Sequence, residues 1–284
     1  MANLRETKNR ISSIKNTSKI THTMQMISAI KSHTSQQAVY KITKYADKIN
    51  DMIAGMDFSY DFDSYLLNNR KKISSALFIV IGPSRGFVGA LPANITNTLA
   101  NFVSVLKHDN KNITFSGIGI NKLGLKTLNS ANIDSENFTG DSLASLPSLI
   151  LEKFKDNLCD RVYIIYPKYI NLLNYKAEVK QLLPIDPSIL DSDHKKHSLD
   201  DTYIFTPNKD EILESLLLQH FEAQIMYASL NLNASEHSTR MVTMKNATDK
   251  ANELSTNLTA VYNRQRQSKI TEQVIEISQG NNKL

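Results

Sequence analysis

Two long stretches of the chain lack both glycine and proline. Neither residue occurs between Met1 and Ala54, nor between Asn208 and Gln279, and all seven prolines fall between Pro83 and Pro207. In a helix interior, glycine costs about 1 kcal/mol and proline about 3 kcal/mol relative to alanine. Each stretch can therefore form one uninterrupted helix. The segment between them, which holds all the prolines, must have a different structure.

Other absences narrow the class of protein. The single cysteine, Cys159, excludes an internal disulfide and a cysteine-cluster metal site, and the seven histidines show no metal-ligand spacing. No apolar run is long enough to cross a membrane. The first residues, MANLRETKNR, have no apolar signal core and include an acidic residue, so they predict neither a secretory signal nor a transit peptide.

Apolar residues in both stretches recur mostly at steps of three, four or seven, as on one face of a helix. At 1.5 Å per residue the two helices would be roughly 80 Å and 105 Å long, more than a domain of about a hundred residues can bury. We therefore expect residues 1–56 and 207–284 to form a long antiparallel coiled coil. The expected apolar face comprises Leu4, Ile11, Ile14, Met24, Ile27, Ile30, Ala38, Ile42, Tyr45, Ile49, Met52 and Met56, facing Leu213, Leu216, Leu217, Phe221, Ile225, Ala228, Leu254, Leu258, Val261, Ile270, Val274 and Ile277.

Polar residues interrupt both stripes, at 32–37 and 231–238. A helix pair this polar is expected to be held partly by a surrounding structure. The charges point the same way, because residues 1–50 carry nine Lys or Arg against Glu6 and Asp47. Basic ends favour an acidic partner, which charge alone leaves open among nucleic acid, an anionic membrane surface and an acidic protein.

The middle predicts a Rossmann-like α/β domain over residues 73–190 with a mostly parallel sheet. Expected strands cover 74–82, 113–120 and 161–166, with a half-exposed strand at 176–183. Expected helices cover 91–106, 123–129 and 143–158, and exposed connections cover 57–72 and 186–206.

The loop GPSRGFVGA, residues 82–90, follows a strand and precedes a helix, where nucleotide-binding folds place a phosphate loop. It matches neither G-x-G-x-x-G nor a GK[ST] motif, so we interpret it as a structural glycine turn. No nucleophile motif and no acidic pair in an apolar setting occurs. The sequence therefore predicts no enzyme activity and no cofactor for this chain alone.

Three separated segments carry a resemblance to a known family. Residues 11–29 (ISSIKNTSKITHTMQMISA), 234–249 (ASEHSTRMVTMKNATD) and 261–277 (VYNRQRQSKITEQVIEI) resemble the terminal helices of F-type ATP synthase gamma subunits, in the family's order. Arg85, Gly86 and Gly89 stand where that family has its Asp-Arg-Gly-Leu-Cys-Gly loop. The resemblance covers the full length and matches the architecture predicted above.

The resemblance implies a central-stalk rotor that couples proton flow to ATP synthesis or hydrolysis by turning inside a ring of alpha and beta subunits. It implies contacts with acidic levers and loops of beta, with the epsilon subunit and with the membrane rotor ring. It also implies a peripheral location on the cytoplasmic side of the cell inner membrane, without direct membrane insertion or nucleic acid.

Five positions match family residues at the rotor–stator contact: Met24, Arg240, Arg266, Gln267 and Thr271. Met24 fits a seam between the helices equally well, whereas Arg240 adjoins apolar Met241 and Val242. Several residues depart from the family pattern: Ser84, Val88, Pro92, the order Glu272-Gln273, and Asn281.

Three alternatives remain at this level. One is the shaft of a specialised or divergent rotary ATPase, which the departures would suit. Another is a coiled-coil adaptor that binds nucleic acid, although neither terminal stretch is rich in aromatic residues. The last is a nucleotide-binding enzyme built on the α/β domain.

Overall fold

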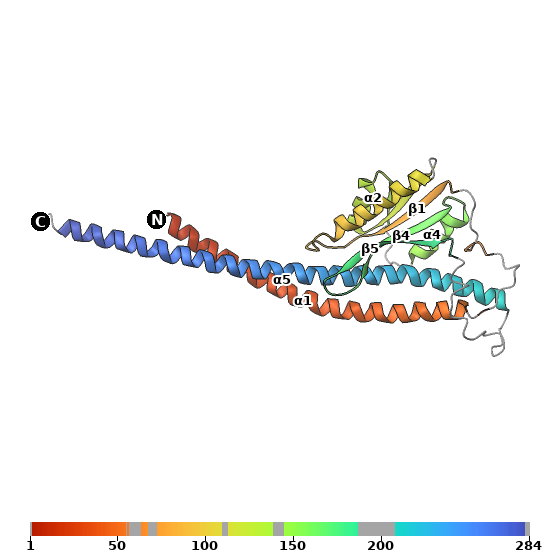
Figure 1. Ribbon diagram of the computed structural model, residues 1–284, viewed down its shortest axis with the longest axis horizontal. Coiled ribbons are helices and arrows are strands. Elements are labelled where there is room, and N and C mark those ends of the chain that lie inside the picture. The colour runs from red at the N-terminus through yellow and green to blue at the C-terminus, as the bar shows by residue number, and fades with distance from the viewer. Residues whose placement is uncertain are drawn as a thin grey trace. The chain divides into compact units, whose positions relative to one another are not determined.

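The computed structural model describes residues 2–54, 56, 64–67, 73–109, 113–138, 145–186 and 208–281. Two long helices, α1 (Ala2–Ala54) and α5 (Lys209–Asn281), confirm the expectation from the glycine- and proline-free stretches (Figure 1). Contacts divide the chain into two compact units, Met1–Ile30 with Arg240–Leu284, and Lys31–Thr239. Each long helix contributes to both units. The domain boundaries expected from sequence stay a prediction.

A five-stranded sheet forms the centre of the unit Lys31–Thr239. Its strands are β1 (Ser75–Ile81), β2 (Thr114–Ile120), β3 (Asp134–Asn137), β4 (Arg161–Tyr169) and β5 (Tyr175–Leu183), in the order β3-β2-β1-β4-β5. The first four are parallel, and β5 runs antiparallel to β4 at one edge. The helices α2 (Leu91–Asp109), α3 (Asn121–Ser130) and α4 (Leu146–Lys155) complete the expected α/β alternation.

The strand predictions are confirmed except for one strand that was missed. Strand β1 lies in the middle of the sheet and buries six of its seven residues, as its apolar run predicts. Strand β3 has the sequence DSEN, without an apolar residue. It is held by parallel pairing with β2 between Ser116↔Asp134 and Gly119↔Asn137, a backbone interaction that leaves no hydrophobic pattern to detect.

The connection expected over 57–72 is not simply exposed. Leu66 is fully buried, and its carbonyl oxygen accepts a hydrogen bond of 2.8 Å from the N–H of Ile185. Residues 57–63 and 68–72 lie outside the described residues, as do 187–206 of the second expected connection and 143–144 of the third expected helix.

The two long helices pair antiparallel within each unit. In the terminal unit, Ser18 Oγ donates to Asn252 Oδ1 at 2.7 Å, and the hydroxyls of Thr21 and Thr248 lie 2.7 Å apart. In the other unit, Ser32 pairs with Ser238 and Asn50 with His220, both at 2.8 Å. Within each unit, residue numbers thus rise along α1 as the numbers of their partners fall along α5, which is the antiparallel arrangement.

The covered positions of α1 form a seam with alternating steps of three and four residues, the repeat of a coiled coil. In the terminal unit the seam residues are Leu4, Thr7, Ile11, Ile14, Ser18, Thr21, Gln25 and Ser28. On α5 the corresponding residues are Met241, Met244, Thr248, Ala251, Ser255, Leu258, Tyr262, Gln265 and Lys269. Hydroxyl and amide side chains therefore occupy much of this seam.

Part of the expected apolar face is wrong. Leu4, Ile11, Ile14, Ile42 and Ile49 are covered, but Ile27 and Ile30 are 50% and 69% exposed. The other expected seam residues that prove exposed are Tyr45, Met52, Leu254, Val261, Ile270, Val274 and Ile277. The helices instead pair through small polar side chains whose hydroxyls also bond within their own helix, as Thr248 Oγ1 does to Met244 O at 2.8 Å.

Candidate functional site

The five residues matched to the rotor–stator contact all lie in the terminal unit. Arg266, Gln267 and Thr271 form a distal group near the C-terminal end of α5, whereas Met24 and Arg240 lie apart from it. Met24 is half-buried three residues after Thr21, whose partner is Thr248. Arg266 is 18 residues beyond Thr248 along α5, about 27 Å at the helical rise. The structure therefore does not bring Met24 together with Arg266.

The distal group lies on a solvent-facing stretch of α5. Arg266, Gln267 and Thr271 are all exposed, and Thr271 Oγ1 donates to the Gln267 carbonyl at 3.0 Å. Within this unit, α5 continues beyond the N-terminus of α1 (Figure 1). These side chains are therefore accessible to a partner protein.

Arg240 differs from the distal group because it is only 7% exposed. Met241 and Val242 beside it are half-buried, as the sequence suggested for a packed surface. A guanidinium this covered contributes its aliphatic stem to packing as well as its charge. A role for Arg240 toward a partner stays a prediction.

The loop of residues 82–90 is shaped by backbone packing. A Cβ on Gly82 would lie 2.4 Å from the backbone nitrogen of Gly124 in α3, so this glycine permits helix and strand to touch. Gly89 has a φ of 55°, a conformation that favours glycine. A Cβ on Gly86 would meet nothing within 4 Å, and Arg85 is exposed. The close packing of α3 supports a structural turn over a phosphate loop.

The same loop is fastened to α5 by a carboxylate that the sequence interpretation did not single out. Ser84 donates its N–H to Glu236 Oε2 at 3.1 Å and its hydroxyl to Glu236 Oε1 at 3.2 Å. Glu236 is 4% exposed. The sequence offers no local signal for it, because the burial of the neighbouring Ser235 and Ser238 is seen only in the structure.

A second polar cluster was also missed, between the long helices and strand β5 in the unit Lys31–Thr239. It borders a cavity of about 270 Å³. Lys180 Nζ donates to Gln224 Oε1 at 2.7 Å, and His220 Nδ1 lies 2.8 Å from Asn50 Oδ1. Burial, with a smaller effect of the Lys180 charge, lowers the pKa of His220 to about 4, and burial also lowers the pKa of Lys180.

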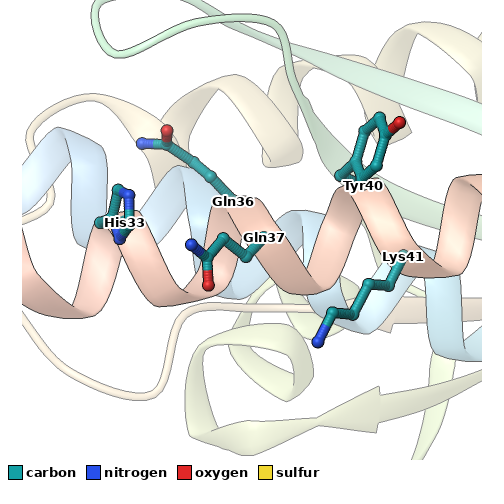
Figure 2. Close-up of a pocket in the computed structure, with 5 residues that line it drawn as sticks. All are labelled: His33, Gln36, Gln37, Tyr40 and Lys41. Carbon is teal, nitrogen blue, oxygen red and sulfur yellow. The ribbon is translucent and has the colours of Figure 1, made fainter.

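A shallow hollow of about 450 Å³ lies along α1, lined by His33, Gln36, Gln37, Tyr40 and Lys41. Figure 2 shows Gln36 and Tyr40 on one side of the helix and Gln37 and Lys41 on the other. Lys44 Nζ lies 5.8 Å from the centre of the Tyr40 ring. These basic, amide and aromatic groups suit a protein contact better than a reaction centre, because the lining residues include no carboxylate.

Metal sites and membrane-spanning helices are both absent from the described residues. They contain no group of three or more His, Cys, Asp or Glu side chains arranged to hold a metal ion. None of the described helices is apolar enough over a sufficient length to cross a bilayer.

These features define a class of protein: two long antiparallel helices that are hydrogen-bonded to each other within each unit, with a small α/β domain between them in the sequence. The family model for ATP synthase matches residues 3–284. The ATP synthase gamma chain of Roseiflexus castenholzii is 34% identical over 99% of this chain and 98% of that relative, and the gamma chain of Geotalea daltonii is 32% identical with the same coverage. The chain belongs to the ATP synthase gamma chain family.

Solved structures show the same fold at lower identity. A chain of the Euglena gracilis mitochondrial ATP synthase OSCP/F1/c-ring structure matches with a TM-score of 0.61 and 17% identity, over 97% of this chain and 92% of that one. A chain of the Tetrahymena thermophila central stalk and c-ring matches with a TM-score of 0.52 and 17% identity, over 80% and 99%.

Proposed function

We propose that the chain is the central rotor shaft of an F-type ATP synthase, coupling transmembrane proton flow to ATP synthesis or hydrolysis. The observation that carries this proposal is the family match over residues 3–284, which spans both long helices and the domain between them. In this role the chain is a non-catalytic subunit, and the reaction takes place on the beta subunits around it.

The outer surface of the shaft supports a surrounding ring. On α1 of the terminal unit, Ile20, Met26, Ile27 and Ile30 are each at least half exposed. Apolar side chains gathered on a surface mark contacts with other molecules. The lysines and arginines of residues 1–50 add a positive surface that complements acidic levers on beta, through exposed contacts of up to about 1 kcal/mol each that can slide rather than lock.

The remaining partners follow from the same role. The chain contacts alpha and beta through the shaft, and contacts epsilon and the membrane rotor ring through the region of the α/β domain. It is held at the cytoplasmic side of the inner membrane by these subunits rather than by a segment of its own.

Rotation can be tested with one fluorophore. Ser104 lies exposed on α2, and Cys159, the only natural cysteine, is 2% exposed, so Ser104→Cys gives a single reactive thiol. We expect the labelled chain, co-expressed with its alpha and beta subunits, to purify as an ATPase. Single-molecule polarisation should then show the label turning in one direction during ATP hydrolysis.

The unsubstituted chain, treated with the same reagent, is the control for labelling of Cys159. A complex that hydrolyses ATP while the label on residue 104 stays fixed relative to the ring would overturn the proposal. So would an alpha–beta ring that assembles without incorporating this chain.

Gln267→Leu tests the distal part of the shaft surface. Because Gln267 is exposed, the substitution should change the free energy of unfolding of the isolated chain by no more than about 0.5 kcal/mol. We expect it nevertheless to weaken coupling, measured as ATP-driven proton pumping per ATP hydrolysed in reconstituted vesicles. Asn263→Leu, exposed one turn earlier on α5, is the matched control. Normal pumping by the Gln267 variant would remove this residue from the contact.

A further inference from the structure

Strand β5 has one apolar and one charged face, and the charged face is not simply turned to solvent. Lys176, Glu178 and Lys180 alternate with Ala177 and Val179, which pack against the hydrophobic core. The polar face of such a strand is normally solvated, as the alternation in the sequence predicts. Glu178 and Lys180 instead line the cavity of about 270 Å³, together with residues of α1, α5 and β4.

The ammonium group of Lys180 has no counter-ion within ion-pairing distance among the described residues. Its hydrogen bond, of 2.7 Å, goes to the neutral Gln224 Oε1. Lys168, the other lysine of the cavity, is already paired with Glu178 at 3.3 Å. Burial lowers the pKa of Lys180; the Glu178 charge opposes this effect and the Lys168 charge adds to it. An anion bound beside Lys180 would favour its charged form and offset the cost of burial.

Two further polar groups of the cavity lack a hydrogen-bond partner in the described part of the chain. Tyr166 is only 2% exposed and lines the cavity, but its hydroxyl bonds to no described residue. Burial, followed by the Glu178 charge, raises the pKa of Tyr166, so the hydroxyl keeps its proton and can donate it. Glu178 Oε2 is buried and accepts no hydrogen bond. Buried polar atoms normally have partners, so the cavity calls for an acceptor near Lys180 and Tyr166 and a donor near Glu178.

The remaining charges of the cavity permit an anion. Lys168 and Glu178 neutralise each other, which leaves Lys180 and Asp47 as the other charged lining residues. Asp47 is exposed, so water and salt screen its carboxylate, and it is not among the charges that shift the pKa of Lys180. Its exposure also shows where the cavity opens to solvent. The nearby His220 is neutral at pH 7, because its pKa is about 4.

The geometry points to this cavity as a binding site for a small oxyanion that still carries a proton, of which inorganic phosphate is the simplest. Its unprotonated oxygens would accept hydrogen bonds from Lys180 Nζ and the Tyr166 hydroxyl, and its P–O–H group would donate to Glu178 Oε2. Sulfate has the same shape but no proton at neutral pH, so the acceptor-only carboxylate of Glu178 would repel it. Such a site would exist whether or not the chain turns as a rotor.

Isothermal titration calorimetry of the full-length chain with inorganic phosphate tests the site. We expect one phosphate to bind per chain, and sulfate to bind at least about tenfold more weakly. Lys180→Met should weaken phosphate binding at least about tenfold, because a charge-assisted hydrogen bond is lost. Tyr166→Phe removes a hydroxyl without a described partner, so it should keep the melting temperature and weaken binding about fivefold. Lys176→Gln is the matched control, because Lys176 is exposed on the same face of β5 outside the cavity.

Glu178→Gln tests the selectivity. An amide can donate a hydrogen bond to sulfate, so this variant should bind sulfate and phosphate with similar affinity. A chain that binds no phosphate, or that binds sulfate as tightly as phosphate, would overturn the phosphate site. Unchanged affinity in either Tyr166→Phe or Lys180→Met would overturn it as well. Glycine is a second probe: tighter binding of glycine than of phosphate would assign the cavity to an amino-acid zwitterion and overturn the assignment to phosphate.

Discussion

Replacing Gly82 with alanine is expected to lower the free energy of unfolding of the chain by about 3 kcal/mol or more. The added Cβ would lie 2.4 Å from Gly124 N and 2.9 Å from the carbonyl carbon of Leu123. Both atoms belong to the backbone of α3, so relief requires the helix to move off the sheet. Urea unfolding followed by circular dichroism of the isolated chain measures the loss.

Gly86→Ala in the same loop is the matched control. Nothing lies within 4 Å of its added Cβ, and the backbone at Gly86 is not left-handed. Its effect should stay within about 0.5 kcal/mol. If Gly82→Ala and Gly86→Ala were equally stable, the close contact between β1 and α3 would not exist in solution.

The glycines of residues 82–90 predict a turn, but not the packing around each of them. The sequence predicts a turn between strand 74–82 and helix 91–106, and both elements are present as β1 and α2. It does not show which backbone approaches each glycine, because Gly124 lies 42 residues further along the chain. Gly82 and Gly86 look alike in sequence. Only the position of α3 shows that Gly82 is required for close packing and that Gly86 is not.

The helices were predictable in extent but not in the direction that their side chains face. The absence of glycine and proline predicted the extent of α1 and α5, whereas the pattern of apolar residues wrongly predicted Ile27 and Ile30 in the seam. Ser28 and Ser32, next to them, are the buried residues. A seam made of hydroxyl groups has no apolar signature, and the apolar residues left outside it are the part of the surface that a ring can cover.

The candidate site, like the helices, could be predicted from the sequence only in part. Exposure of Arg266, Gln267 and Thr271 agrees with a surface role, which stays a prediction for each residue. The polar pairs Ser84–Glu236, Lys180–Gln224 and Asn50–His220 join residues far apart in sequence, so no local pattern could reveal them. They fasten the sheet and helix α1 to helix α5, and a shaft that transmits torque to its domain needs such fastening.

The chain is expected to lose stability on acidification through His220. The folded protein holds the pKa of His220 at about 4, below its ordinary value of 6.5, because the ring is buried and lies near the Lys180 charge. A proton therefore binds the unfolded chain first as the pH falls. The contribution of neutral His220 to the free energy of unfolding is fully present above pH 6.5. It falls by about 3 kcal/mol as the pH drops to about 4.

His220→Gln isolates this effect, because a glutamine amide can still bond to Asn50 but does not titrate in this range. The groups facing His220 are Lys180 and Asn50, with Lys168, Glu178 and Asp47 lining the adjoining cavity. Urea unfolding at pH 7 and pH 4.5 should show a smaller loss for His220→Gln than for the unsubstituted chain. The exposed His33→Gln is the control and should keep the full loss. Were His220→Gln to show the same loss as the unsubstituted chain, acid unfolding would have to arise from groups other than His220.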